Sequence, residues 1–338
     1  MTSTNSTWNE QQNKPFLLKA IGKSSLWGGN RLNDEFSKGL DVSPLAESWE
    51  CSTHPEGESV VGSGEFSGKT LRSVLASHPH FLGSHPNTNG ELPILIKLID
   101  AQQGLSVQVH PDDDFAREHE NGQLGKTEMW YVLDAQKDAH LVYGLRHSIT
   151  TKELRRSIEK GELSKHLQKV PVKKNDLFYI EAGTIHAIGA GVLVAEIQEN
   201  SNLTYRIYDY DRVDKFGNKR QLHVEKALQV AKCKASTEPA QPFRVLRYRR
   251  GCATELLCRC KYFEVHRMLV NTERCRELVT FQADSASFRV LLCYEGCGCI
   301  YVDGEEPLKF FKGDCIFVPA NSAVLSIHGQ ARFLDVRG

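Results

Sequence analysis

The chain has 338 residues, of which 40% are hydrophobic and 25% charged, and this composition excludes a disordered or fibrous protein. Forty-two basic residues balance forty-two acidic ones, so no overall field would hold the protein on nucleic acid or on an anionic membrane. The apolar runs are shorter than a membrane span, and the polar first residues lack a signal-peptide core. We therefore expect a cytoplasmic protein, a monomer or weak homo-oligomer, whose partner is a small molecule.

The ten cysteines are concentrated near the C-terminus, where all but Cys51 lie between Cys233 and Cys315. A chain without an export signal should keep its thiols reduced. The "CRC" and "CGC" pairs have one residue between the thiols, whereas zinc knuckles usually have two. We interpret these cysteines as packed or incidental thiols rather than a second metal site.

In chain order, the predicted elements are mostly strands. The polar residues 1–14 are expected to form a flexible tail. In "LSVQVHPDDDF", residues 105–115, apolar and polar residues alternate with the period of a strand. Further strands are predicted at 128–133, 139–144, 176–183, 288–296 and 299–304, where runs rich in Val, Ile, Tyr and Phe are separated by Gly, Asn and Asp turns. This rhythm predicts a mainly β protein of the sandwich or jelly-roll kind.

Helices are predicted in three places. Asp112 to Asp114 should cap a helix in "FAREHEN", residues 115–121. Residues 150–170 begin with a possible capping box at Thr150 and Glu153, and Gly161 should divide this segment into two short helices. A third helix is predicted at 221–231. The Ser, Thr and Pro residues of the following segment, 232–243, indicate a linker, and we place the domain boundary there.

An internal repeat supports that boundary. "KNDLFYIEAGTIH", residues 174–186, resembles "KGDCIFVPANSAV", residues 312–324, and the strands before each copy also resemble one another. We therefore predict two barrels of one type, at 15–234 and 235–338, with a helical insertion at about 148–170 in the first. His186 in the first copy corresponds to Val324 in the second, so a metal held by His186 would be confined to the first barrel.

Four polar residues could converge in that first barrel. Gln108 and His110 share one strand face, Glu128 begins a strand, and His186 follows a small-residue turn. Two imidazoles, a carboxylate and an amide oxygen suit a divalent ion such as zinc and leave a position open for a substrate oxygen. Singly, each signal is weak, because a lone His or Glu in a β protein is usually hydrogen-bonded or solvated.

Five segments resemble type I mannose-6-phosphate isomerases, most closely the short bacterial form, and occur in family order. They are "SSLWGG" (24–29), "AESWECSTHP" (46–55), "LPILIKLIDAQQGLSVQVHPDD" (92–113), "GKTEMWYVL" (125–133) and "AGTIHAIGAGVLVAEIQENSNLTYRIYDYDR" (182–212). The resemblance covers about the first two thirds of the chain. Beyond about residue 240 the match is only generic to cupins.

The resemblance implies a cupin barrel, one Zn²⁺ per chain, and interconversion of mannose 6-phosphate and fructose 6-phosphate. The zinc ligands it implies are Gln108, His110, Glu128 and His186. The other positions that match the family's active site are Ser106, Lys126, Lys97, Glu196 and Arg206, with Trp27 and Glu47 matching its outer parts. We take Arg206, Lys126 and Glu196 as candidate catalytic residues, and Lys97, Ser106, Trp27 and Glu47 as candidate substrate-binding residues.

The chemistry of these residues suits an aldose–ketose isomerase that works through an enediol. Zinc would stabilise the developing charge, and Glu196 or Lys126 could carry the proton between neighbouring carbons. The sequence does not choose between these two. Lys97, Ser106 and Lys126 are candidate phosphate donors, and Arg206 could brace the phosphate or the enediolate. Two alternatives remain at this point: an iron-dependent cupin dioxygenase, and a sugar-binding bicupin without catalytic activity.

Overall fold

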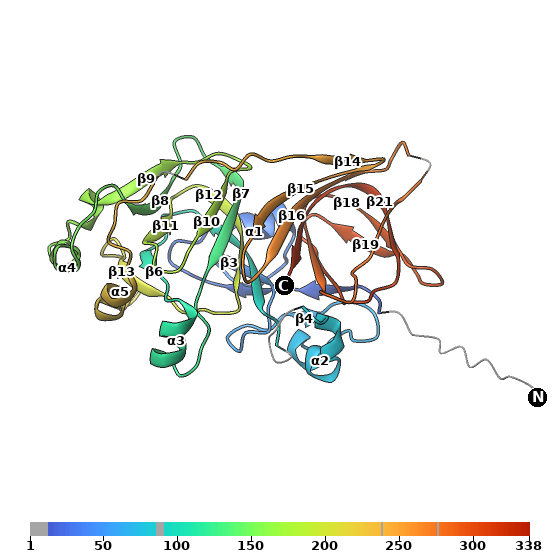
Figure 1. Cartoon of the computed structure of the whole chain (residues 1–338), viewed down its shortest axis with the longest axis horizontal. Helices are drawn as coiled ribbons and strands as arrows, with labels where there is room; N and C mark the ends of the chain where they lie inside the picture. The colour runs from blue at the N-terminus through green and yellow to red at the C-terminus, as the bar shows by residue number, and fades with distance from the viewer. Residues whose placement is uncertain (1–12, 86–90, 238, 276) are drawn as a thin grey trace, which may run out of the picture.

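The computed structural model describes residues 13–85, 91–237, 239–275 and 277–338. The predicted tail, residues 1–14, lies outside these ranges except for Asn13 and Lys14. The described chain is mainly β, as predicted, and its N-terminal and C-terminal strands form two groups that lie side by side (Figure 1). Among the described helices, none has the length and apolar character needed to cross a bilayer.

Two antiparallel sheets build the N-terminal barrel. The six-stranded sheet has the order β10-β7-β12-β5-β3-β2, and the five-stranded sheet has the order β13-β6-β11-β8-β9. The strands of the first sheet are β2 (Ile21–Lys23), β3 (Glu47–Cys51), β5 (Ile94–Ala101), β7 (Glu128–Ala135), β10 (Leu177–Ile180) and β12 (Val192–Glu199). Those of the second are β6 (Val107–Val109), β8 (His140–Leu145), β9 (Leu167–Pro171), β11 (His186–Ile188) and β13 (Tyr205–Tyr208).

A ten-stranded sheet forms the C-terminal half and also recruits two strands from the start of the chain. Its C-terminal strands are β14 (Arg247–Arg249), β15 (Cys252–Arg259), β16 (Glu264–Asn271), β17 (Val279–Phe281), β18 (Arg289–Tyr301), β19 (Leu308–Phe311), β20 (Cys315–Val318) and β21 (Leu325–Arg337). The recruited strand β1 (Phe16–Lys19) pairs with β20 and, on its other side, with β4 (Val60–Val61). Residues from the first 61 positions therefore complete a sheet made mostly of residues after 246.

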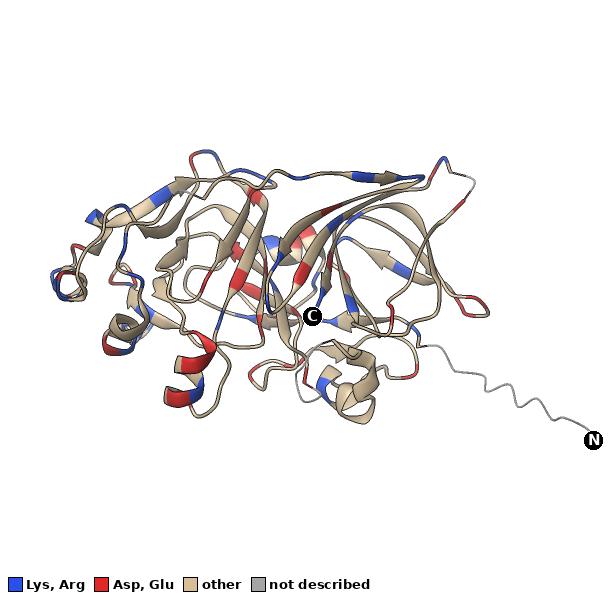
Figure 2. Cartoon of the chain, viewed as in Figure 1, with Lys and Arg blue, Asp and Glu red and all other residues tan. Residues whose placement is uncertain are grey.

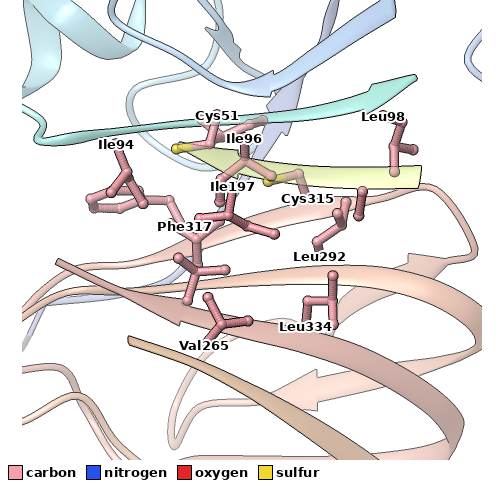
Figure 3. Packing of buried hydrophobic residues seen from close by; sticks show 14 of the residues in the cluster. Cys51, Ile94, Ile96, Leu98, Ile197, Val265, Leu292, Cys315, Phe317 and Leu334 are labelled. Carbon is pink, nitrogen blue, oxygen red and sulfur yellow. The ribbon is translucent and has the colours of Figure 1, made fainter. Parts of the chain in front are cut away.

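A single apolar core joins the two halves, because strands of the six-stranded sheet are buried on both faces. In β5, Ile94, Ile96 and Leu98 pack against Leu292 and Leu334 of the C-terminal sheet (Figure 3). The intervening residues of β5 face the interior of the N-terminal barrel. This two-sided burial explains why "LPILIKLI" is continuously apolar except for one lysine.

Helices α3 and α4 confirm predictions from the sequence, and the residues after α4 correct one. In α3 (Asp113–His119), which carries acidic residues in its first turn (Figure 2), Asp112 is the N-cap as expected. In α4 (Thr151–Glu159), Thr150 and Glu153 form the predicted capping box. The second half of that segment was predicted to be helical, and this prediction is wrong. It forms only a 3₁₀ turn, η2 (Leu163–Lys165), because the next residues pair with β8 as strand β9.

The remaining helices lie around these sheets. They are α1 (Arg31–Phe36), α2 (Leu71–Ser77), the 3₁₀ turn η1 (Pro79–Leu82) and α5 (Val224–Val230). The last of these confirms the helix predicted at 221–231. Helix α5 covers the outward face of β6, and α4 packs against α5; Val107 and Val109 are buried in one apolar cluster with residues of both helices. The apolar side of the alternating segment therefore packs outside the barrel, as its pattern predicts.

The internal repeat is confirmed at the level of hydrogen bonds. Before β10, the Asp176 carboxylate accepts a hydrogen bond from the backbone N–H of Lys173 at 2.9 Å. Before β20, the Asp314 carboxylate accepts one from the N–H of Phe311 at 2.8 Å. In both copies the residue before the aspartate has positive φ, 73° at Asn175 and 101° at Gly313. The two segments are the same turn and strand, used once in each half.

All ten cysteines lie in the described part of the chain, and each is a free thiol. Cys51 and Cys315 come from different halves and are both buried in the shared core (Figure 3). Burial raises the pKa of both thiols well above its ordinary value. These two cysteines therefore pack as small apolar side chains.

Candidate metal and sugar-phosphate site

Four side chains form a row across the inward face of the six-stranded sheet, on neighbouring strands β3, β5, β12 and β7. They are Trp49, Lys97, Glu196 and Trp130. Lys97 Nζ lies 3.2 Å from Glu196 Oε1 and 5.0 Å from the centre of the Trp49 ring. Trp130 Nε1 donates a 2.8 Å hydrogen bond to Glu196 Oε2. The row is a buried ion pair between two indoles, an arrangement that holds both charges in place.

A second row crosses the five-stranded sheet on β13, β6, β11 and β8. It consists of Arg206, Gln108, His186 and Tyr143, each opposite the next in register. The centre of the His186 ring lies 5.3 Å from that of Trp130 in the other row. The two rows therefore face each other across the inside of the barrel.

Three buried groups converge between these rows. Nitrogen and oxygen ligand atoms of His110, Glu128 and His186 all lie within 4.8 Å of one another. His186 Nε2 is 3.3 Å from Glu128 Oε1, and His110 Nε2 is 3.6 Å from Glu128 Oε2. Gln108 Nε2 lies 3.4 Å from His186 Nε2, so the amide borders the same space. This group could hold a metal ion.

Backbone carbonyls orient the two imidazoles. Nδ1 of His110 is 2.7 Å from the carbonyl oxygen of Leu203, and Nδ1 of His186 is 2.8 Å from that of Thr184. A nitrogen that faces a carbonyl must carry the proton, so each Nε2 presents a lone pair toward Glu128. Burial lowers the pKa of His186 to about 4 and that of His110 well below its ordinary value. Both rings are therefore neutral at neutral pH, as metal ligands must be.

The buried surroundings of the Glu128 carboxylate favour a bound cation. It is fully buried, and neither oxygen accepts a hydrogen bond of good geometry within the described residues. Burial raises the pKa of Glu128, and the nearby Glu196 adds to the increase. Lys126 Nζ lies 2.7 Å from Oε2, but this ammonium is shared with Glu196, and Oε1 faces the neutral imidazole of His186. A second positive charge would therefore stabilise the buried carboxylate further. A divalent ion would supply that charge.

Two lysines complete the charge network. Lys126 Nζ lies 2.7 Å from Glu128 Oε2, 3.2 Å from His110 Nε2 and 3.8 Å from Glu196 Oε1. Lys97 Nζ also approaches Glu47 Oε2, at 3.6 Å. Although burial raises the pKa of Glu196, Lys126 and Lys97 outweigh this effect and hold it below its usual range. Two ammonium groups face three carboxylates here, which leaves an excess of negative charge for a cation.

The other end of the second row is positively charged. Arg206 Nε donates to Ser106 Oγ at 3.2 Å, and Arg206 also donates to the carbonyl of Gln221 at 2.9 Å. Burial lowers the pKa of Arg206, and nearby Arg220 adds to the decrease. Clustered guanidinium groups beside a hydroxyl suit a phosphate dianion.

The structure brings ten of the eleven predicted site residues into these contacts, in two groups. Lys97, Lys126, Glu128, Glu196 and Glu47 share the ion-pair network, which also touches His110 and His186. Ser106 accepts a hydrogen bond from Arg206, and the role of Ser106, Lys97 and Lys126 as phosphate donors stays a prediction. Trp27 packs in an apolar cluster beside Trp130, and its role in substrate binding remains a prediction.

Two tryptophans that were not predicted from the sequence support this network. Trp130 donates to Glu196, and Trp49 Nε1 donates to Glu47 Oε2 at 2.8 Å. The signal was present, because Trp130 lies two residues after Glu128 and Trp49 two after Glu47. Residues two apart on a strand share a face.

Comparison with known proteins gives the family. Residues 16–147 match the model of the phosphomannose isomerase type I catalytic domain. The mannose-6-phosphate isomerase ManA of Bacillus subtilis is 38% identical over 322 residues, which are 94% of this chain and 97% of that protein. This chain belongs to the type I mannose-6-phosphate isomerases. A mannose-6-phosphate isomerase of Streptococcus mutans is 38% identical over 307 residues, 90% of this chain and 92% of its own length.

Solved structures of mannose-6-phosphate isomerases agree with this assignment. The crystal structure of the Bacillus subtilis enzyme matches with a TM-score of 0.86 and 32% identity, covering 97% of this chain and 100% of that one. The match confirms the predicted cupin fold. Type I mannose-6-phosphate isomerases are aldose–ketose isomerases, and the predicted enzyme class is confirmed with the family.

Proposed function

We propose that this chain interconverts mannose 6-phosphate and fructose 6-phosphate at the space enclosed by the two rows, with one zinc ion bound. Family membership supports the reaction. The single observation that supports the metal is the fully buried Glu128 carboxylate, whose ligand atom lies within 4.8 Å of those of His110 and His186. The two imidazoles beside it each turn a lone pair toward it.

The residues that would hold the ion are His110, Glu128 and His186, with Gln108 as the fourth. Imidazole, carboxylate and amide oxygen form a donor set of the borderline hardness that zinc accepts. Bound there, zinc would act as a Lewis acid toward the sugar oxygens at C1 and C2. Trp130 and the backbone carbonyls of Thr184 and Leu203 keep the imidazoles oriented, so little reorganisation accompanies binding.

Proton transfer between C1 and C2 is assigned to the pair Lys126 and Glu196. Each is 3% exposed, and their charged atoms lie 3.8 Å apart beside the metal-binding group. Glu196 Oε1 faces both lysines, at 3.2 Å from Lys97 Nζ and 3.8 Å from Lys126 Nζ, and their charges keep the carboxylate ionised, the form that can accept a proton. Lys126 Nζ can deliver or hold the proton at the sugar oxygen that becomes the enediol hydroxyl. Lys97 keeps Glu196 ionised between turnovers.

The phosphate group is assigned to Arg206 and Ser106. Their contact lies on β13 and just before β6, at the end of the second row away from Tyr143. Arg212 and Arg220 add positive charge near Arg206. Binding the remote phosphate would fix the sugar so that C1 and C2 reach the Lys126 and Glu196 pair, which lowers the entropic part of the barrier.

Two other functions make different predictions. An iron-dependent dioxygenase would need the bound metal to be iron and would consume oxygen. A sugar-binding bicupin would bind mannose 6-phosphate without turning it over. A coupled assay of fructose 6-phosphate formation, performed with the metal content measured in the same sample, separates all three. Turnover that depends on zinc and not on oxygen supports the proposed function, and absence of turnover by zinc-loaded protein would refute it.

A further inference from the structure

The short segment that carries Lys126 and Glu128 is fixed by two acidic side chains, one on each side. The backbone N–H of Gly125 donates to Asp113 Oδ1 at 3.1 Å. The N–H of Thr127 donates to Glu199 Oε1 at 2.7 Å. Lys126 lies between these two anchored residues, so the position of its backbone depends on both acidic side chains.

The segment is also pressed against the start of α3. A Cβ at Gly125 would lie 2.4 Å from the carbonyl carbon of Asp112, closer than any side chain tolerates. The N–H of Lys126 donates to the carbonyl of Pro111 at 3.0 Å. A shift of Asp113, the first residue of α3, would therefore move the residues that place Lys126.

Asp113 uses its second oxygen to contact the C-terminal half. Tyr262, in the turn between β15 and β16, donates its hydroxyl proton to Asp113 Oδ2 at 2.9 Å. Lys261 Nζ reaches the same oxygen at 3.2 Å, but its side chain is 75% exposed and that of Asp113 only 15%. Because exposed ion pairs are weak, the tyrosine is the more effective partner. One carboxylate thus bonds to Gly125 in one half and to Tyr262 in the other.

We propose that Tyr262 is a positioning residue for Lys126, acting through Asp113 and the Gly125 backbone. This inference rests on the proposed function, because it assigns the C-terminal half a part in placing a catalytic lysine. Lys126 Nζ has contacts of 2.7 Å to Glu128 and 3.2 Å to His110, which a displacement of about 1 Å would break. Displacements of that size cost about 100-fold in rate, and loss of one hydroxyl among several anchors should cost about tenfold.

Docking of the two halves does not depend on this hydroxyl. Next to Tyr262, Phe263 and Val265 are buried in the shared apolar core with Leu292 and Leu334. Replacing Tyr262 with Phe removes one oxygen and keeps the ring, so the fold should persist. A purely structural role for the hydroxyl would therefore appear in thermal stability or zinc content rather than in kcat.

The test compares zinc-loaded full-length wild type, Tyr262→Phe, Asp113→Asn and the double variant in the mannose 6-phosphate assay. Tyr248→Phe, on a 77% exposed tyrosine of the same half, is the matched control. We expect Tyr262→Phe to lower kcat about tenfold, with KM, zinc content and Tm unchanged. We expect the double variant to be no slower than the slower single variant, since both substitutions interrupt one chain of contacts.

Several results would overturn the inference. The first is an unchanged kcat in Tyr262→Phe. The second is a loss of kcat that is explained by a loss of zinc or of folded protein. The third is a double variant in which the two substitutions reduce kcat multiplicatively. If Tyr262→Phe does not fold, Asp113→Asn takes its place in the comparison, and an unchanged kcat there also overturns the inference. A zinc-loaded wild type without turnover would instead refute the proposed function, so the two failures are distinguishable.

Discussion

Gln108 and His186 lie directly opposite each other on strands β6 and β11, with the amide nitrogen 3.4 Å from the imidazole Nε2. The amide can rotate to present its oxygen to the same point, because the oxygen and nitrogen of a glutamine occupy equivalent positions. A cross-strand pair of this kind would fix the two proposed ligands through the register of the sheet. His110 follows on the same segment as Gln108, and Glu128 approaches from β7 of the other sheet.

Removing either member of this pair should release the metal without unfolding the barrel. We expect Gln108→Ala and His186→Ala each to weaken zinc binding by at least about 100-fold, since even residues that only support metal ligands contribute about 10- to 100-fold. Zinc titration with a chromophoric competitor measures this, and circular dichroism checks the fold. Tyr143→Phe, next to His186 in the same row, is the control. A variant that kept both zinc and rate would show that its residue is not a ligand.

Substitution of Glu196 and Lys126 identifies the group that moves the proton. Glu196→Gln and Lys126→Met preserve size, and the glutamine can still accept the hydrogen bond from Trp130. The variant that lacks the transferring group should lose about 10²- to 10⁴-fold in kcat at saturating mannose 6-phosphate. The other variant should lose less. If both kept kcat within about tenfold of wild type, neither residue would be the base.

Arg206→Gln should raise KM more than it lowers kcat, because the phosphate takes no part in bond breaking. Loss of a charged hydrogen bond of about 1.5 to 3 kcal/mol corresponds to a rise of about 10- to 150-fold in KM. Arg155→Gln, an exposed arginine paired with Glu225 in the same barrel, should change neither constant. A fall in kcat with unchanged KM in Arg206→Gln would place Arg206 at the reacting carbons instead.

Much of this site could be predicted from the sequence, because a strand's period decides which side chains share a face. Alternation placed Gln108 inside and Val107 outside, and the structure agrees. The repeat placed His186 at the start of a strand. Contacts between distant segments could not be predicted this way: nothing local distinguishes Tyr262 or Asp113 from ordinary surface residues, and their meeting depends on how the two halves pack. The helix predicted after Gly161 is wrong for the same reason. Its residues have helical spacing, but they pair with β8 as a strand, and this long-range pairing decides their structure.

The protonated state of Glu199 makes stability depend on pH near neutrality. Burial is the largest cause that raises the pKa of Glu199 from 4.5 to about 8, and the hydrogen bond and negative charge of Asp113 add to the increase. The stability gained from this proton is full below the unfolded pKa and is lost as pH rises through about 8. Asp113, whose pKa is lowered, stays ionised over this range. Tyr262 and Cys260, the other titratable groups facing Glu199 from the C-terminal half, have raised pKa values and stay protonated.

We therefore expect the Tm of the wild type to fall between about pH 5 and pH 8 and to level off above that range. The side chain of Glu199→Gln cannot ionise, so the Tm of this variant should fall less steeply over the same pH range. Differential scanning calorimetry of both proteins in matched ionic strength measures the difference. Parallel curves would show that Glu199 is already ionised at neutral pH.

The shared core should make the two halves unfold together. Ile96 is fully buried between them, and Ile96→Ala should reduce the free energy of unfolding by about 2 to 5 kcal/mol. A single calorimetric transition is expected for wild type and variant alike, because β1 also ties the start of the chain to β20. Two separate transitions, with only the first shifted by Ile96→Ala, would contradict this.

The most direct test of the account is turnover of mannose 6-phosphate to fructose 6-phosphate by one sample, before chelation, after chelation, and after zinc is added back. The geometry of His110, Glu128 and His186 predicts that activity disappears with the metal and returns with one zinc ion per chain. Activity that survives complete removal of zinc would contradict the proposed role of these residues.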